Sequence, residues 1–240
     1  MHRPSMILFD YGQTLIKEQG FDGERGTAAV MQYAVKNKYN LTAKEVQAKA
    51  DTINKELNRF HPETRHLSQV EVRVEPFEAY LYESMGIQLS ISYNQAGEVF
   101  WDHAVTYQPT DGIEEFLVFL HERGIRSGVI SNISFTGKAL TDRINRLLPK
   151  NHFEMILASS EYVFRKPNPR IFQLALTKAD LKAEDVWYVG DNYECDVLGA
   201  KGVGMLPFWY TAAIDFKQDM SHECLKIGTW EELRSIIEQL

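Results

Sequence analysis

Hydrophobic and polar positions follow different periods in different parts of the chain. Residues 5–10 are an apolar run that ends in the carboxylate of Asp10, and such a run predicts a buried strand. From about 17 to 106, apolar residues recur every three or four positions, which is typical of amphipathic helices. From about 107 onward, short apolar runs alternate with helical patterns, as expected for strands joined by helices.

The middle region predicts four helices with short connections, which indicates a compact helical bundle. The apolar face of the first helix consists of Ala28, Met31, Ala34 and Val35. The second follows a capping box of Thr42 with Glu45, ends at His61-Pro62, and has as its apolar positions Val46, Ala50, Ile53, Leu57 and Phe60. The third ends near Gly86 and is marked by Val70, Val74, Phe77 and Leu81. The fourth begins with Ser92 and Gln95, and its inward positions are Ala96, Val99, Phe100 and His103.

The remaining sequence predicts an α/β fold. Strands are expected at about 126–131, 153–158, 186–190 and 204–209, and helices at about 112–123, 136–147, 169–178, 194–201 and 230–240. This alternation predicts a doubly wound, parallel-sheet (Rossmann-like) core with helices on both faces. Residues 1–16 and 107–240 would form this core, and residues 17–106 an α-helical insertion with hinges near 16–23 and 105–110.

Composition and charge exclude some classes of function. The 240 residues are 44% hydrophobic and 25% charged, and the formal net charge of −7 argues against a nucleic-acid partner. A small phosphorylated substrate stays compatible, because one metal ion and one lysine can reverse the local field. The apolar runs are too short to span a bilayer and the N-terminus has no signal-peptide pattern, so we expect a cytoplasmic protein without a membrane partner. Cys195 and Cys224 are then expected to be free thiols, and the protein a monomer or homodimer.

Polar motifs stand at the ends of the predicted strands or in the loops that follow them. They are ILFDYGQTL at 7–15, VISN at 129–132, RKPNP at 165–169, and VGDNYECD at 189–196 followed by Gly199-Ala200. In this order and spacing they resemble the four motifs of the haloacid dehalogenase superfamily. The helical insertion after the first motif resembles the cap domain of the first type in that family. The resemblance covers nearly the whole chain.

The resemblance implies a Mg²⁺-dependent hydrolase that acts on a small phosphorylated metabolite. Asp10 would be the nucleophile that takes the phosphoryl group as an aspartyl phosphate, and Lys166 would neutralise charge on Asp10 and on that group. Mg²⁺ would bridge the two anions, held by Asp10, Asp191 and the backbone carbonyl of Gly12. Asp196 belongs to the same metal site, more through a metal-bound water or Lys166 than as a direct ligand.

Three further positions are implied to serve the substrate. Ser131 would donate a hydrogen bond to a phosphoryl oxygen, helped by the backbone N–H of Asn132. Thr14 would fix the loop that follows the nucleophile.

The first motif departs from the pattern of the family's phosphatases at two positions. Two residues after the nucleophile, a second aspartate usually protonates the leaving group and then activates water, but here the residue is Gly12. The next position, usually glycine, is Gln13. The departure removes a general acid–base worth about 10²–10⁴-fold in rate.

This departure leaves three hypotheses open. The protein is a phosphatase in which another group carries the proton, with Tyr11, Gln13, His61, Glu63 and His66 as candidates. It instead cleaves carbon–phosphorus bonds, with Lys55 as a candidate Schiff-base lysine in the cap, or carbon–halogen bonds. In the third hypothesis it is a weakly active regulatory protein that binds phosphate and Mg²⁺. The dehalogenases lack the fourth motif, so Asp191 and Asp196 favour the metal-dependent branch.

Overall fold

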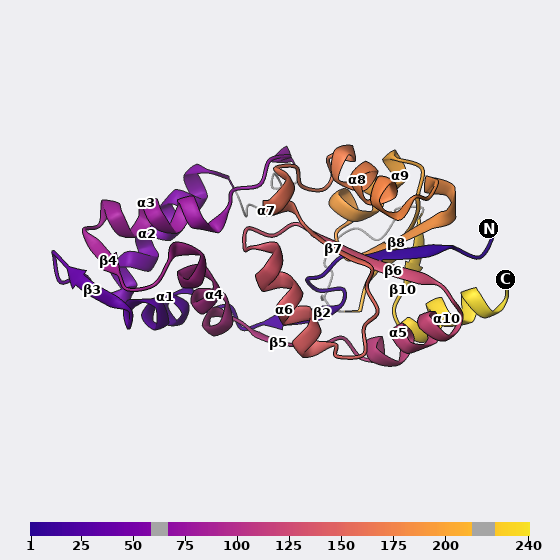
Figure 1. The fold of residues 1–240 in the computed structure, drawn as a ribbon, viewed down its shortest axis with the longest axis horizontal. Helices are drawn as coiled ribbons and strands as arrows, with labels where there is room; N and C mark the ends of the chain where they lie inside the picture. Colours follow the sequence, from indigo (N-terminus) through magenta and orange to yellow (C-terminus); the bar gives the residue numbers. More distant parts are fainter. Residues whose placement is uncertain (59–66, 213–223) are drawn as a thin grey trace.

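A computed structural model describes residues 1–58, 67–212 and 224–240, and Figure 1 shows them arranged as an α/β core with a helical cap at one end. Both termini lie at the end of the core farthest from the cap. The predicted fold class is therefore confirmed. Among the described residues, no helix combines the length and apolar character that crossing a membrane requires.

The core is built on a six-stranded parallel sheet in the order β10-β9-β8-β1-β6-β7. Its strands are β1 (Met6–Phe9), β6 (Arg126–Ser131), β7 (Met155–Ala158), β8 (Val186–Gly190), β9 (Leu206–Tyr210) and β10 (Leu225–Ile227). The chain leaves β1 for β6 and β7 on one side, then returns to β8 on the other. Such a change of direction opens a crevice at the carboxyl ends of the strands, where α/β proteins bind ligands.

Alternate side chains of the buried strands pack against helices on opposite faces of the sheet. Ile7 and Phe9 of β1 join a core cluster with α5 (Ile113–Glu122), α6 (Gly137–Leu147) and α10 (Trp230–Glu238). Met6 and Leu8 instead join a cluster with α8 (Pro169–Ala179) and α9 (Gly199–Gly202). This two-residue alternation is the reason why β1 is apolar throughout, since both of its faces are covered.

The cap contains the helices α1 (Gly23–Met31), α2 (Ala43–Glu56), α3 (Val74–Ser84) and α4 (Tyr93–Ala104). They enclose a separate apolar cluster that includes Val30, Val46, Ile53 and Leu81. The predicted capping boxes are both present: Thr42 with Glu45 begins α2, and Ser92 with Gln95 begins α4. The cap therefore has a hydrophobic core of its own.

Cap and core are connected at several places, one of them the ion pair between Asp102 of α4 and Arg143 of α6. The antiparallel strands β2 (Ile16–Gln19) and β5 (Thr106–Pro109) carry the chain into the cap and back out of it. The stretch before α3 also bonds to the core, because Glu71 N–H donates to the Val163 carbonyl at 2.7 Å and Arg165 N–H donates to the Gln69 carbonyl at 3.1 Å. An isolated antiparallel bridge joins Val70 to Phe164 between these bonds.

Four expectations for the cap were wrong. His103 was expected to point inward from α4, but it is exposed. Ala34 and Val35 lie in β3 (Ala34–Asn37), which pairs with β4 (Ile87–Leu89), and Val35 is exposed, so they do not extend the first helix. Val70 bonds to the core and stays outside α3. Leu57 follows the end of α2 and is exposed. In these cases a tertiary pairing or the end of a helix overrode the helical spacing. Phe60 lies outside the described residues.

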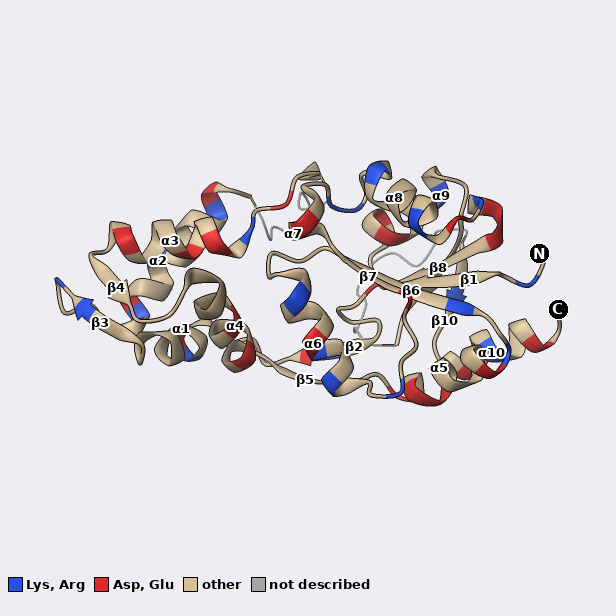
Figure 2. Cartoon of the chain, viewed as in Figure 1, with Lys and Arg blue, Asp and Glu red and all other residues tan. Residues whose placement is uncertain are grey.

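Short elements complete the chain between these parts. They are α7 (Ser159–Tyr162), the 3-10 turn η2 (Ala183–Asp185) and the π-helical turn η3 (Tyr193–Leu198). The sequence predicted an ordinary helix in place of η3 with α9. Figure 2 shows acidic and basic residues interspersed on the helices of both cap and core.

Candidate active site

The residues of the four motifs meet at the carboxyl ends of the central strands. Asp10 directly follows β1, Ser131 is the last residue of β6, and Asp191 directly follows β8. Lys166 comes from the loop between α7 and α8. All four line one cavity of about 920 Å³ between core and cap. Side chains spread over residues 10–191 thus meet in a single site, because parallel strands end at the same edge of the sheet.

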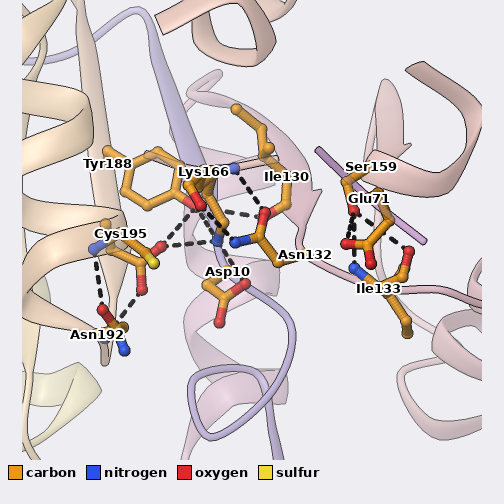
Figure 3. A network of polar contacts seen from close by, with 11 residues as sticks. Asp10, Glu71, Ile130, Asn132, Ile133, Ser159, Lys166, Tyr188, Asn192 and Cys195 are labelled. Carbon is orange, nitrogen blue, oxygen red and sulfur yellow. Dashed lines mark hydrogen bonds and ion pairs between the residues drawn. The ribbon is translucent and has the colours of Figure 1, made fainter. Parts of the chain in front are cut away.

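The ammonium group of Lys166 is fully buried and contacts three oxygen atoms (Figure 3). Its Nζ donates to Asp10 Oδ1 at 2.6 Å, to Asp196 Oδ1 at 2.7 Å and to the Tyr188 hydroxyl at 2.8 Å. The Tyr188 hydroxyl in turn donates to the Ile130 carbonyl at 3.2 Å. Lys166 therefore holds a fixed positive charge beside the carboxylate of Asp10.

Charge pairing decides the protonation of this buried group. Burial lowers the pKa of Lys166. The neighbouring carboxylates of Asp10 and Asp196 together raise it by more than burial lowers it, so the pKa lies above the usual lysine range. Burial also raises the pKa of Asp196, against the effect of Lys166. Tyr188 keeps its proton, because burial and then Asp196 raise its pKa well above the usual value. The site therefore keeps an ammonium ion and a neutral phenol at neutral pH.

Asn132 fixes the backbone on which Lys166 is mounted. Its side-chain amide donates to the Lys166 carbonyl at 2.7 Å, and its carbonyl oxygen accepts from the Lys166 N–H at the same distance. The sequence predicted a contribution from the backbone N–H of Asn132 only. The side chain's paired bonds across 34 residues were not foreseen.

The acidic residues are arranged in a way that fits a divalent cation. Oxygen atoms of Asp10, Asp191 and Asp196 lie within 4.8 Å of one another. Three carboxylates beside one ammonium group leave excess negative charge, which suits a hard cation with oxygen ligands. Both oxygens of Asp196 already accept hydrogen bonds, Oδ1 from Lys166 and Oδ2 from the Asn192 N–H at 2.9 Å. Asp10 and Asp191 are thus better placed than Asp196 to be direct ligands.

Thr14 lies in the loop after Asp10, which the sequence predicted it to fix. Thr14 is fully buried, does not line the cavity, and accepts a hydrogen bond from the Thr110 hydroxyl through its carbonyl at 2.8 Å. It is placed to support the loop, and the structure does not bring it to a substrate. Gly12 does line the cavity, and a β-carbon built on it would meet no atom within 4 Å.

Gln13 adopts the left-handed conformation, with φ of 55°, that glycine usually supplies. Its side-chain amide donates to the Glu18 carbonyl at 2.7 Å and so ties the loop to β2. Its conformation explains why glycine is common at this position of the family's motif. The space beside Gly12 and the backbone there would both accept a side chain.

The side chains that the sequence offered as proton carriers or as a reactive lysine lie in different surroundings. The pKa of Tyr11 is raised by burial and then by Glu18, so its hydroxyl keeps its proton. His61, Glu63 and His66 lie outside the described residues. Lys55 lines the cavity from α2 but is an exposed side chain. Glu18 lines the cavity too, although its sequence neighbours gave no signal, because only the pairing of β2 with β5 places it there.

Glu71 and Arg165 are further cavity residues that the sequence did not single out. The Glu71 side chain accepts from the Ser159 hydroxyl at 2.7 Å and lies 3.6 Å from Arg165 (Figure 3 shows the first contact). Both side chains are largely buried. The pair joins the cap segment before α3 to the loop that carries Lys166.

Comparison with known proteins places this geometry in a family. The model of the haloacid dehalogenase-like hydrolase family matches residues 5–204. The chain belongs to the haloacid dehalogenase-like hydrolases. The family assignment agrees with the residues that meet at the strand ends.

Curated relatives of this hydrolase match parts of the chain. Human haloacid dehalogenase-like hydrolase domain-containing protein 3 is 39% identical over 108 residues, which are 45% of this chain and 42% of that protein. This chain thus spans less than half the length of that relative. A glyceraldehyde 3-phosphate phosphatase of Pyrococcus furiosus is 27% identical over 165 residues, or 67% of each chain.

Solved structures of the family resemble this hydrolase over its full length. A 2-haloacid dehalogenase from Pseudomonas syringae covers 100% of this chain and 99% of its own, with a TM-score of 0.66 and 19% identity. A phosphatase of the family from Thermococcus onnurineus covers 99% and 98%, with a TM-score of 0.64 and 20% identity. At these identities the likeness establishes the fold, shared by proteins of different chemistry.

Proposed function

We propose that this hydrolase is a Mg²⁺-dependent phosphatase that acts on a small phosphorylated metabolite, with Asp10 as the nucleophile. The observation that carries the proposal is the placement of Asp10, which lies at the cavity floor with Lys166 at 2.6 Å and two further carboxylates near by. A carboxylate held beside a fixed cation and a divalent-metal site is suited to attack an anionic phosphorus. Phosphatase names among the relatives support the same chemistry.

The chain's own residues account for the electrostatics of the transfer. Asp10 Oδ forms a bond to phosphorus while the ester P–O bond breaks, and the leaving oxygen takes up a proton. Water then attacks the aspartyl phosphate, which releases inorganic phosphate and restores the Asp10 carboxylate. Lys166 stabilises the negative charge near Asp10 in both steps, and Ser131 and the backbone N–H of Asn132 are proposed to donate hydrogen bonds to phosphoryl oxygens.

The metal-binding residues follow from the same geometry. Asp10, Asp191 and the Gly12 carbonyl would hold Mg²⁺, which when bound would offset the repulsion between carboxylate and phosphate. Asp196 would act through Lys166 and the Asn192 backbone, because its oxygens are occupied by those bonds.

The domain division is also proposed on this basis. Residues 17–106 would be the cap, and residues 1–16 and 107–240 the core. The paired strands β2 and β5 would form the hinge, because they are where the chain crosses between the two parts. Closure of the cap over the strand ends would exclude water from the reaction.

Lys55 gives the carbon–phosphorus hypothesis little support. It lines the cavity but is exposed, whereas a Schiff-base lysine is typically activated by a desolvated apolar pocket or a neighbouring cation. The acidic group formed with Asp191 likewise favours metal-dependent phosphoryl transfer over carbon–halogen cleavage, because displacing a halide from carbon does not require a metal between two anions.

Covalent trapping tests the proposed nucleophile. Enzyme mixed with a phosphate ester labelled at phosphorus and quenched in acid should carry the label on Asp10, and mild base or hydroxylamine should remove it. The Asp10→Asn variant should carry none, while an exposed variant such as Asp180→Asn should label as wild type does. Labelling of another residue, or equal labelling of Asp10→Asn, would contradict the assignment.

A further inference from the structure

Gly12 leaves the proposed phosphatase without the aspartate that usually stands two residues after the nucleophile, yet a further carboxyl group, that of Glu18, lies in the same cavity. Glu18 lines this cavity together with Asp10 and Gly12. It lies on β2, eight positions after Asp10 in the sequence. No atom lies within 4 Å of where a Gly12 β-carbon would be, so the space beside Gly12 is open.

Several contacts hold Glu18 in place. Its backbone pairs with Tyr107 in the ribbon of β2 and β5, and its carbonyl accepts from the Gln13 amide at 2.7 Å. Its carboxyl oxygen Oε1 accepts from the Trp101 indole N–H of α4 at 3.3 Å. The carboxyl group is thus held from the cap by Trp101 of α4, while the Glu18 backbone is held by β5 and by the loop after Asp10.

The surroundings of Glu18 suit a group that has to hold a proton. Burial raises its pKa, and the Asp10 charge raises it further. Arg143 of α6, the Trp101 indole and the Tyr11 hydroxyl lower the pKa, but the net shift is upward. These are the charged and polar groups that face Glu18 from α6, α4 and the loop after β1.

We propose that Glu18 is the general acid and base of this phosphatase, in place of the carboxyl group that Gly12 lacks; the assignment rests on the proposed function. In the first step the Glu18 carboxyl group gives its proton to the leaving oxygen as that oxygen separates from phosphorus. In the second step the Glu18 carboxylate takes a proton from the water that attacks the aspartyl phosphate. The proton balance then closes over one turnover, with Glu18 protonated again.

Leaving-group dependence of the Glu18→Gln variant tests the assignment. Glutamine keeps an oxygen that accepts the Trp101 N–H, so the fold should survive, as checked by circular dichroism and thermal melting. The kcat/KM of the variant should fall about 10²–10⁴-fold on an alkyl phosphate such as a sugar phosphate, but less than about tenfold on p-nitrophenyl phosphate, whose leaving group needs no proton. The exposed Glu24→Gln variant on α1 is the matched control and should behave as wild type.

Two further readouts separate chemistry from structural damage. The wild-type kcat/KM on the alkyl ester should fall as pH rises through the Glu18 pKa, because the acid has to be protonated, and Glu18→Gln should lack this limb. Adding Gly12→Asp to Glu18→Gln should recover at least about tenfold on the alkyl ester, because the second carboxyl group restores the acid.

The outcomes are distinguishable. Equal losses on both esters, or no loss on either, would overturn the assignment of Glu18 while the phosphatase itself stands. Should Glu18→Gln not fold, the wild type alone decides: a steep decline in kcat/KM from aryl to alkyl esters would overturn the assignment, and a shallow one would support it. No release of phosphate by wild type from any ester would contradict the proposed function, and this assignment with it.

Discussion

The side chain of Lys166 is held at the residue scale by oxygen atoms from three different parts of the core. They belong to Asp10 after β1, Tyr188 in β8, and Asp196 in η3. A buried ammonium group is tolerated only where such partners compensate for its lost hydration. Its position therefore depends on the loop that carries it, and that loop depends on Asn132.

Asn132→Ala tests this dependence. The variant loses two hydrogen bonds to the Lys166 backbone, each worth about 0.5–1.5 kcal/mol, so the free energy of unfolding should fall by about 1–3 kcal/mol. The kcat should fall more than the KM rises, because Lys166 would be displaced from the nucleophile while the backbone N–H at 132 remains. Urea unfolding and steady-state kinetics measure both quantities. An unchanged stability and kcat would show that the paired bonds do not position Lys166.

The backbone conformation of Gln13 leads to a prediction about stability that does not depend on activity. Its left-handed φ of 55° costs a residue with a β-carbon about 1–2 kcal/mol relative to glycine, while its side chain bonds to the Glu18 carbonyl. Gln13→Ala keeps the strain and loses the bond, so it should be about 1 kcal/mol less stable than Gln13→Gly, which loses the same bond but relieves the strain. Denaturant unfolding of the two variants decides. Alanine equal to or more stable than glycine would contradict the observed backbone conformation.

At the scale of elements, the segment before α3 joins cap to core through a buried side chain. Glu71 accepts from Ser159 and pairs with Arg165, and the backbone on either side bonds to residues 163 and 165. The contact lies directly ahead of Lys166 in the chain. It therefore couples the position of the cap to the loop that carries Lys166.

Replacing Glu71 tests this contact. Glu71→Ala leaves the largely buried Arg165 without its carboxylate partner, so the free energy of unfolding should fall by about 2–4 kcal/mol. Glu75→Ala on α3 removes an exposed pair with Arg73 and should change it by less than about 1 kcal/mol. Limited proteolysis of the hinge strands should accelerate in the first variant only. Equal effects of the two substitutions would show that the buried contact does not hold the cap.

Local signals in the sequence were sufficient for most elements of the core and for the cap helices with capping boxes. Continuous apolar runs located β1, β6 and β8, because strands covered on both faces are apolar throughout. The short pairs β2–β5 and β3–β4 were missed, as was β10, because their stability comes from partners distant in sequence. Site residues inside motifs could be named, whereas Glu18 and Glu71 could not, since only tertiary pairing brings them to the cavity.

At the scale of the whole molecule, the protein carries a formal net charge of −7, yet its cavity would take an anionic substrate. Lys166 supplies one positive charge against three clustered carboxylates, so a bound divalent cation is needed to make the site attractive to phosphate. Metal binding should therefore stabilise the folded protein.

Thermal melting with and without Mg²⁺ measures this linkage. At a Mg²⁺ concentration about 100-fold above Kd, a gain of about 2.7 kcal/mol should raise Tm by about 5–10 °C. Asp191→Asn should abolish the increase, whereas the exposed Asp180→Asn variant should retain it. A wild-type Tm that does not respond to Mg²⁺, or an unchanged increase in Asp191→Asn, would contradict the metal site.

The most direct test of the account is a phosphate-release assay on wild type and Asp10→Asn, with and without Mg²⁺. The panel would contain sugar phosphates, nucleotides, acyl phosphates and p-nitrophenyl phosphate, with a phosphonate and a 2-haloacid as alternatives. We predict release by wild type that requires Mg²⁺ and is lost, by more than about 10³-fold, in a folded Asp10→Asn protein. Release that survives Asp10→Asn, or turnover of the phosphonate or haloacid alone, would contradict it.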